Sequence, residues 1–274
     1  MDFRVFVDWH EKYKTAKIVF PLSFTNDYAT YEIPFGAIQR YQYTLTGPPK
    51  NKMYMPEREW EEADKAKFEV PALRWVDVTD ENKEYGVALL NDGRYGFDFK
   101  GNLLRMTLLR GARRGYPSTP ESWTDQSDTP YVGTHELRYA IYTHEGDWRI
   151  GYVTNKGYEF NFPLLVHVEE SAHKGPLPKS YSFIEVKPND VILTVVKKSE
   201  DSQALVLRMY ETRSEDHKVE VVFDIPVTSA VTTDLMEWER YAFPRDVVID
   251  GNRIKFEIRH NEVVTLQVQL KESL

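Results

Sequence analysis

Apolar and polar residues alternate along most of the chain, and this period of two residues predicts β-strands. In the segment "LLRMTLL" (103–109) one face carries Leu104, Met106 and Leu108, so we expect that face to meet a core. Glycine-containing turns separate the apolar segments at 91–93, 100–102 and 145–147. The strands predicted in this first part of the chain are 3–9, 16–24, 73–78, 85–90, 103–109 and 136–142.

A second series of strands follows a loop with two prolines at 169–180. Short strands at this spacing are typical of a small antiparallel sandwich, so we predict an all-β chain with domains at 1–175 and 176–274. Only the stretch 56–68 favours a helix, with a proline first, acids early and lysines late. The strands of the second series are 182–186, 191–198, 205–211, 219–225, 253–259 and 262–270.

Composition excludes several function classes. The 274 residues include no cysteine, so disulfides, thiolate metal sites and thiol catalysis are excluded, which fits a reducing cytoplasm. A net charge of −8 gives no electrostatic reason to expect binding to nucleic acid or an anionic membrane. No apolar stretch approaches the ~20 residues of a membrane helix. The 17 Tyr, 14 Phe and 6 Trp favour β-structure and also suit sugar binding.

No compact catalytic motif is present. The seven histidines form no HExxH pair, and the GxSxG, P-loop and GxGxxG patterns are absent. His167 and His173 would lie about 20 Å apart on one strand, beyond any shared ion. A glycosidase needs two carboxylates, ~5–5.5 Å apart if retaining and ~6.5–9.5 Å apart if inverting, and 43 acids leave the pair undetermined. Asp92 is more simply an Asx-turn residue before Gly93. We therefore predict no catalytic and no metal-binding residue in this chain.

Arg105 lies on the mixed face of the strand 103–109, where a core would rather take an apolar residue. A buried arginine requires a carboxylate partner, and we expect Asp77 or Asp98 to supply it. This structural pair is preferred to a direct contact of Arg105 with sugar.

Several long segments of the chain match one known family in order. They include "DWHEKYKTAKIVFPL" (8–22), "YGVALLNDGRYGFDFKGNLLRMTLLRG" (85–111) and "THELRYAIYTHEGDW" (134–148). Together they resemble the C-terminal region of family 38 glycoside hydrolases, the α-mannosidases, and most closely their cytosolic, prokaryotic-like branch. The resemblance implies a galactose-mutarotase-like β super-sandwich followed by a small C-terminal antiparallel β-sandwich. The remaining matching segments are 29–40, 68–78, 191–211 and 231–239.

The resemblance also implies a function for the intact enzyme, the retaining, zinc-dependent hydrolysis of terminal α-mannosidic bonds. Family members place the Asp nucleophile, its acid partner and the zinc ligands in an N-terminal part, and nothing here is similar to that part. We therefore expect a C-terminal fragment that is inactive alone and has no cofactor of its own. Its expected partners are the missing N-terminal catalytic domain, an α-mannoside and, through an exposed apolar patch, further copies of itself.

By the family match, the loop after the strand 103–109 reaches the rim of the active site, largely through backbone contacts. Leu109, Arg110 and Gly111 are accordingly the predicted substrate-binding rim residues. The family continues with a short link to a Gly-x-His, whereas this chain has the longer segment 112–135. His135 matches the family's histidine, with a rim contact or a structural hydrogen bond as its role.

Two other function classes stay open at this point. The aromatic content permits a free-standing carbohydrate-binding module. The expected super-sandwich permits a mutarotase-like sugar enzyme, with His135 and Glu136 as the nearest candidates for its His and carboxylate. Adjacent strand residues point to opposite faces, which counts against the second alternative.

Overall fold

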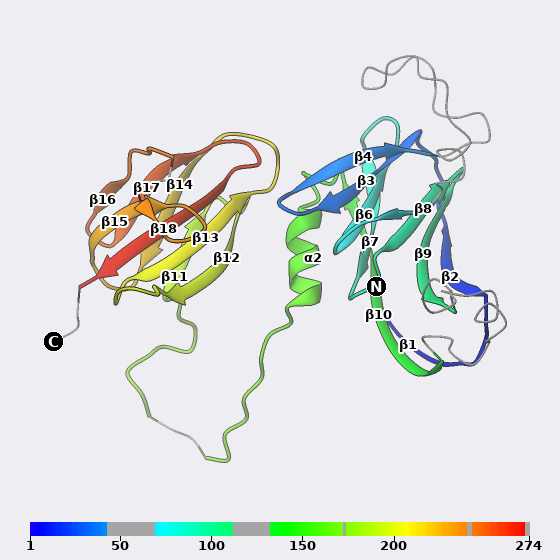
Figure 1. Ribbon diagram of the computed structural model, residues 1–274, viewed down its shortest axis with the longest axis horizontal. Coiled ribbons are helices and arrows are strands. Elements are labelled where there is room, and N and C mark those ends of the chain that lie inside the picture. The colour runs from blue at the N-terminus through cyan, green and yellow to red at the C-terminus, as the bar shows by residue number, and fades with distance from the viewer. Residues whose placement is uncertain (43–68, 112–131, 172–173, 240–242, 272–274) are drawn as a thin grey trace, which may run out of the picture. The chain divides into compact units, whose positions relative to one another are not determined.

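The computed structural model describes residues 1–42, 69–111, 132–171, 174–239 and 243–271, and Figure 1 shows that strands dominate it. The all-β prediction is confirmed. The chain divides into two compact units, residues 1–163 and 164–274. The predicted domain boundary at 175/176 falls in the segment between the last helix of the first unit and the first strand of the second. The predicted helix at 56–68 lies outside the described residues.

The first unit contains two antiparallel sheets. A six-stranded sheet has the order β1-β10-β7-β6-β3-β4, and a four-stranded sheet has the order β2-β9-β8-β5. The strands are β1 (Asp2–Trp9), β2 (Thr15–Pro21), β3 (Tyr28–Ile33), β4 (Gly36–Tyr41), β5 (Val70–Pro71), β6 (Trp75–Thr79), β7 (Tyr85–Asn91), β8 (Gly96–Lys100), β9 (Leu103–Arg110) and β10 (Gly133–Glu145).

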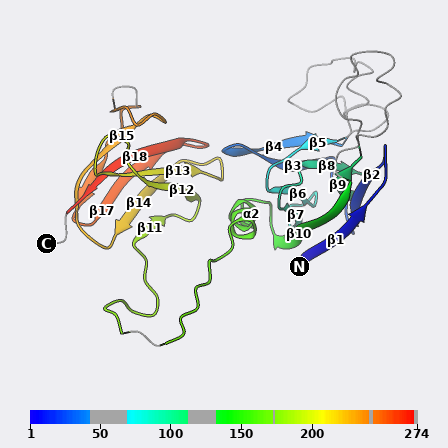
Figure 2. The same cartoon turned by 60° about the horizontal axis from the view of Figure 1, so that its bottom comes forward.

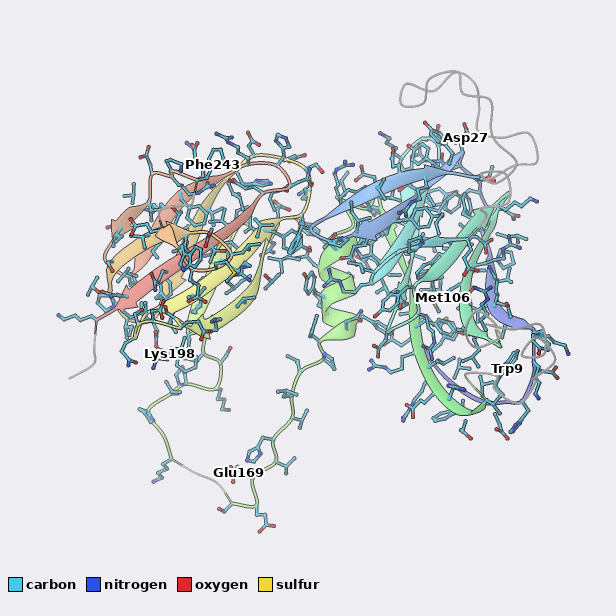
Figure 3. The ribbon with its side chains drawn as sticks, in the orientation of Figure 1. Trp9, Asp27, Met106, Glu169, Lys198 and Phe243 are labelled. Carbon is cyan, nitrogen blue, oxygen red and sulfur yellow. The ribbon has the colours of Figure 1, made fainter. Side chains whose placement is uncertain are left out.

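The core of this unit lies between the two sheets. Leu104 and Met106 of β9 are fully buried and Leu108 nearly so, which confirms the face predicted from the alternating pattern. Leu89 from the six-stranded sheet and Phe97 from the four-stranded sheet join the same cluster. Met106 is labelled within this unit in Figure 3. Burial of such side chains contributes roughly 1.5–3 kcal/mol each, so the sandwich is held by this shared interior.

A helix, α2 (Val153–Asn161), covers the outer face of the six-stranded sheet. It belongs to a second apolar cluster with Trp75 and Trp148, whose ring centres lie 5.3 Å apart. Figure 2 shows α2 on one side of β6, β7 and β10, with β2, β8 and β9 on the other. The sequence analysis was wrong to expect no helix beyond 56–68. This segment has a weak helix propensity, and it forms because Gly157 lets it pack closely on Trp75.

No helix in the described part of the chain is long and apolar enough to cross a membrane.

The second unit is a sandwich of two four-stranded antiparallel sheets, β11-β14-β17-β16 and β12-β13-β18-β15. Its core combines residues from both sheets, among them Leu207, Phe256 and Leu266. The alternating pattern located six of these eight strands and missed β15 and β16. The strands are β11 (Ile184–Lys187), β12 (Val191–Lys198), β13 (Leu205–Glu211), β14 (His217–Phe223), β15 (Val227–Thr233), β16 (Val248–Asp250), β17 (Arg253–Ile258) and β18 (Val263–Leu270).

Candidate functional site

The predicted rim residues lie at the end of β9, where this strand pairs with the start of β2. The Gly111 N–H donates to the carbonyl of Lys14 at 2.9 Å, and its own carbonyl accepts from the Tyr13 N–H at 2.7 Å. The Leu109 side chain is buried and the Arg110 side chain is exposed. Of the three predicted positions, Arg110 alone has an exposed side chain, and the backbone of the buried Gly111 is already bonded within the sandwich.

His135 lies in the other sheet of the same unit, on β10, where it pairs with Val7 of β1. Residues 10–14 connect β1 directly to β2, so His135 and the end of β9 lie near the same end of the sandwich. His135 is half-buried, whereas the neighbouring Glu136 is exposed and paired with Arg4. These two side chains leave opposite faces of β10, so they do not form the His–carboxylate pair of a mutarotase-like enzyme. The rim role of His135 stays a prediction.

Arg105 has the carboxylate partner predicted from the sequence. Its guanidinium donates to Asp98 on the neighbouring strand β8. Lys17 of β2 donates to the other oxygen of Asp98 at 2.6 Å. The Asp98 side chain is only 2% exposed, and these two cations bond both of its carboxylate oxygens. The other predicted partner, Asp77, is engaged elsewhere.

This charged cluster continues toward Arg110 through Glu69. Lys17 donates to Glu69 at 2.5 Å, and the Thr107 hydroxyl donates to it at 2.7 Å. Partial burial raises the pKa of the Glu69 carboxyl, but the bonds from Lys17 and Thr107 and the charge of Arg110 outweigh burial and lower it. The side chain of Arg110 thus extends from a face of the sheet on which cations and carboxylates are already paired.

The turn after β7 is structural, but its Asx residue is Asn91 and not Asp92. The Arg94 N–H donates to the Asn91 side-chain oxygen at 2.6 Å, and Gly93 has φ 78°. Asn91 is fully buried and its amide both donates and accepts, which a carboxylate cannot do. Asp92 is exposed, with a carboxylate oxygen 3.8 Å from Arg138.

A buried His–Asp pair, which the sequence analysis did not predict, joins β10 to β6. The Nε2 atom of His144 lies 2.7 Å from Asp77, and the two side chains are 2% and 0% exposed. The Thr79 hydroxyl donates to the second Asp77 oxygen at 2.8 Å. The other ring nitrogen, Nδ1, lies 3.2 Å from the carbonyl of Glu145. Both ring nitrogens face acceptors, so an imidazole protonated on both nitrogens can donate a hydrogen bond to each of them.

Two glycines make room for the His144 ring. A Cβ atom on Gly86 would lie 2.4 Å from the ring carbon Cε1, and one on Gly151 would lie 2.4 Å from Cγ. Burial lowers the pKa of the imidazole, but the hydrogen bond and charge of Asp77 raise it by more. Because neither side chain reaches solvent, the pair positions the strands and does not contact a ligand.

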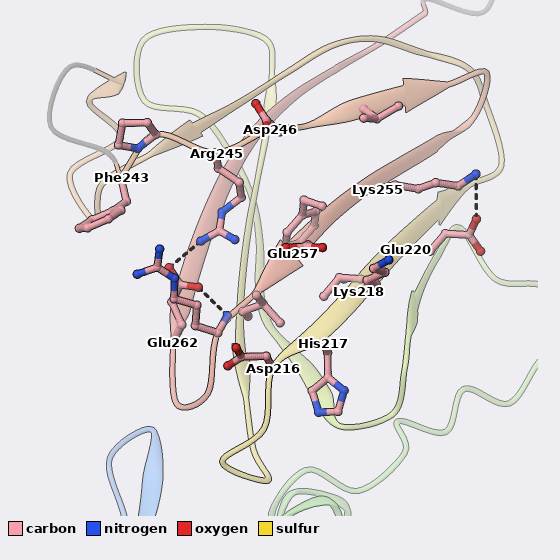
Figure 4. A pocket seen from close by; sticks show the side chains of 16 residues that line it. Asp216, His217, Lys218, Glu220, Phe243, Arg245, Asp246, Lys255, Glu257 and Glu262 are labelled. Atoms are coloured by element: carbon pink, nitrogen blue, oxygen red, sulfur yellow. Dashed lines mark hydrogen bonds and ion pairs between the residues drawn. The ribbon is translucent and has the colours of Figure 1, made fainter.

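An open groove of about 920 Å³ lies on the second unit. Its floor is the solvent-facing side of β14 and β17, including Lys218 and Glu257, and one wall is the segment 243–246. Figure 4 shows these side chains around the hollow, with Arg245 bonded to Glu262. The sequence analysis gave no signal for this groove, because its parts come from three separate stretches of the chain.

The family resemblance assigns zinc to the N-terminal part of the intact enzyme, and the sequence analysis predicted no metal ligand in this chain. In the described part of the chain, no group of three or more His, Asp or Glu side chains is placed to hold a metal ion. We therefore derive no chemical step through a metal on these residues.

Two family models match the chain. "Glycosyl hydrolases family 38 C-terminal domain" matches residues 1–118, and "Glycosyl hydrolases family 38 C-terminal beta sandwich domain" matches residues 190–266. Each falls within one of the two structural units.

Similar proteins agree with this match. Alpha-mannosidase 2C1 of Homo sapiens is 33% identical over 273 residues, which are 98% of this chain and 23% of that protein. An alpha-mannosidase of Saccharomyces cerevisiae is 32% identical over 75% of this chain and 17% of its own length. The crystal structure of an alpha-mannosidase from Enterococcus faecalis V583 has the same fold, with a TM-score of 0.70 over 98% of this chain, 27% of that chain and 17% identity. The chain spans about a quarter or less of the length of these relatives.

Two antiparallel sandwiches in series, each matched by a C-terminal model, define the chain as the β-rich region of a glycoside hydrolase. The chain belongs to glycosyl hydrolase family 38 and corresponds to the C-terminal region of its α-mannosidases.

Proposed function

We propose that this chain serves as the non-catalytic C-terminal part of an α-mannosidase that hydrolyses terminal α-mannosidic bonds. One observation carries the proposal. The two family models that describe C-terminal domains of family 38 match the first and the second unit of this chain, in that order. In this proposal the nucleophile, the acid and the zinc ligands are supplied by polypeptide outside residues 1–274. The chain packs against that catalytic part in the cytoplasm, and the lack of cysteine supports this location.

The contribution to substrate binding is the rim at Leu109–Gly111. The backbone bonds of Gly111 hold the end of β9 in place, and the Arg110 side chain extends from it into solvent. A guanidinium has five N–H donors and no acceptor, so it suits the hydroxyl oxygens of a mannoside. Because Glu69 is already bonded to Lys17 and Thr107, the donors of Arg110 stay available to a substrate.

Turnover of p-nitrophenyl α-mannoside tests the proposal. We expect no turnover from the chain alone with zinc, and turnover when it is co-expressed with the human relative trimmed of its matching C-terminal region. Turnover by the chain alone that is lost in Asp92→Asn contradicts the proposal, as does an inactive mixture that elutes as one complex.

The rim contact has its own readout in the same complex. Arg110→Ala removes one charged donor worth about 1.5 kcal/mol, so KM should rise roughly ten-fold while kcat changes little. Arg253→Ala, an exposed arginine of the second unit, is the control and should leave KM unchanged.

A further inference from the structure

We propose that the groove on the second unit binds a neutral oligosaccharide. This inference does not depend on the proposed hydrolysis, because binding in the groove requires no bond cleavage and no residue outside the second unit. At about 920 Å³ the groove has room for a ligand of several sugar rings, at the upper end of the ~300–1,000 Å³ typical of ligand sites.

The wall of the groove is held in place before any ligand arrives. Arg245 donates to Glu262 at 2.5 Å, and the second oxygen of Glu262 accepts the backbone N–H of Arg259 at 2.8 Å. The Arg245 side chain is only 12% exposed, and its guanidinium lies 5.7 Å from the ring centre of Phe256. A wall fixed in this way reduces the ordering cost that a ligand would otherwise meet.

The floor presents polar groups that the protein itself does not use. Lys218 and Glu257 are paired in register on β14 and β17, and both side chains are exposed. Within the described residues, the side chains of Lys218, Glu257 and Asp246 make no hydrogen bond or ion pair. Figure 4 shows Glu257 in the centre of the view, with Arg245 on one side and Lys218 on the other. Sugar hydroxyls both donate and accept, so they match an ammonium donor beside carboxylate acceptors.

The charges of the groove favour a neutral ligand over an ion. Arg245 is compensated by Glu262, and Lys255 lies 3.8 Å from Glu220 and 3.2 Å from Asp250. The groups left without a partner carry both signs and do not form a cluster of one charge. The groove therefore lacks the concentrated field that would select an anion or a cation.

An exposed aromatic ring adds an apolar contact at the edge of the groove. Phe243 is 70% exposed, and the Arg259 guanidinium lies 5.6 Å from its ring centre. This cation–π contact orients the ring and leaves most of its surface accessible. The C–H face of a sugar packs against such a ring while its hydroxyls reach the polar floor.

Isothermal titration of the full chain tests the proposal with α-1,2-mannotetraose, maltotetraose, cellotetraose and a sulfated oligosaccharide as probes. We expect at least one neutral probe to bind, with no binding of the sulfated one. Lys218→Ala, Glu257→Ala and Phe243→Ala should each raise its Kd about ten-fold or more. Lys198→Ala is the matched control, because Lys198 is an exposed lysine on β12, in the other sheet, and Figure 3 shows it away from Phe243.

Three results would overturn the inference: no binding of any neutral probe, binding of the sulfated probe alone, or binding whose Kd the three groove variants leave unchanged. The variants alter exposed side chains, and circular dichroism confirms that each is folded. Because the readout is affinity, a failure here is distinguishable from a failure of the proposed mannosidase role.

Discussion

Replacing Asp77 by alanine tests how much the buried pair with His144 stabilises the first unit. Asp77→Ala removes the acceptor that lies 2.7 Å from the His144 ring and 2.8 Å from the Thr79 hydroxyl. Removing one partner of a buried pair costs about 3–5 kcal/mol, because the other charge stays buried and unpaired. The control is Asp8→Ala, which breaks a His10–Asp8 contact of 2.8 Å whose side chains are 65% and 68% exposed. That change should cost less than about 1 kcal/mol.

Urea unfolding followed by tryptophan fluorescence measures the difference. Trp75 and Trp148 lie in the apolar cluster under α2, and Trp238 is the one tryptophan of the second unit, so the signal reports mainly on residues 1–163. With a slope of about 2 kcal/mol per molar urea, the midpoint should fall by roughly 2 M in Asp77→Ala and by under about 0.5 M in Asp8→Ala. Equal midpoints in the two variants would refute the assignment of stability to burial of the pair.

The pH dependence follows from the direction of the His144 pKa. Asp77 raises it above the usual 6.5, so the His144 charge contributes fully below about pH 6.5 as long as Asp77 is ionised, and this contribution is lost as pH rises through the folded-state pKa of His144. Burial raises the pKa of Asp77, so at acid pH the contribution is lost again when that carboxyl protonates. The gap between wild type and Asp77→Ala should therefore narrow at alkaline pH. In an NMR titration His144 should titrate above 6.5 in the wild type, and a midpoint at or below 6.5 would contradict the argument.

Three further outcomes are expected. Arg74→Ala leaves Glu32, whose side chain is 1% exposed, without the guanidinium 2.5 Å away, and should lower the urea midpoint as far as Asp77→Ala does. Gly111→Ala places a Cβ atom 2.5 Å from a backbone oxygen, so thermal unfolding should show a loss of about 1–3 kcal/mol. Lys17→Met removes the strongest donor to Glu69, whose NMR-measured pKa should rise toward 4.5. The stability that Glu69 contributes above about pH 4.5 in the wild type, and loses as pH falls through its folded-state pKa, should then be absent.

Matched controls exist for each of these variants. Arg4→Ala breaks an ion pair in which Arg4 is 63% exposed, and it should change the free energy of unfolding by less than about 1 kcal/mol. Gly175→Ala adds a Cβ atom with nothing within 4 Å and should leave the melting temperature unchanged. Lys14→Met breaks an exposed contact with Glu11 and should not move the pKa of Glu69. If a control variant changes the measured stability, melting temperature or Glu69 pKa as much as its test variant does, the buried contact assigned to that test variant is not the cause.

Strand prediction succeeded where the alternating pattern was long, and it failed where tertiary contacts define the element. The apolar face of β9 was visible in the sequence because Leu104, Met106 and Leu108 recur at a period of two. Strand β16 has only three residues, all exposed, and is defined by its pairing with β17. Helix α2 contains few strong helix formers and exists because it covers the ring surface of Trp75 and Trp148.

The same division holds for the charged pairs. Arg105 and Asp98 are opposite each other in the hairpin of β8 and β9, so the need of a buried arginine for a nearby carboxylate found the pair. His144 and Asp77 are 67 positions apart, and they meet only because β10 and β6 both flank β7. No local pattern encodes that order of strands.

The sequence by itself determined the all-β character, the positions of the turns, the family resemblance and the need of Arg105 for a carboxylate, Asp77 or Asp98, because these depend on local sequence patterns. The tertiary structure alone decided which acid pairs with His144, that Asn91 rather than Asp92 closes its turn, and where the groove of the second unit lies. One wall of that groove is the segment 243–246, held by a bond between Arg245 and Glu262, and its floor lies on β14 and β17. Such sites depend on the order in which strands pair across a sheet, and that order is set by the packing of the whole unit.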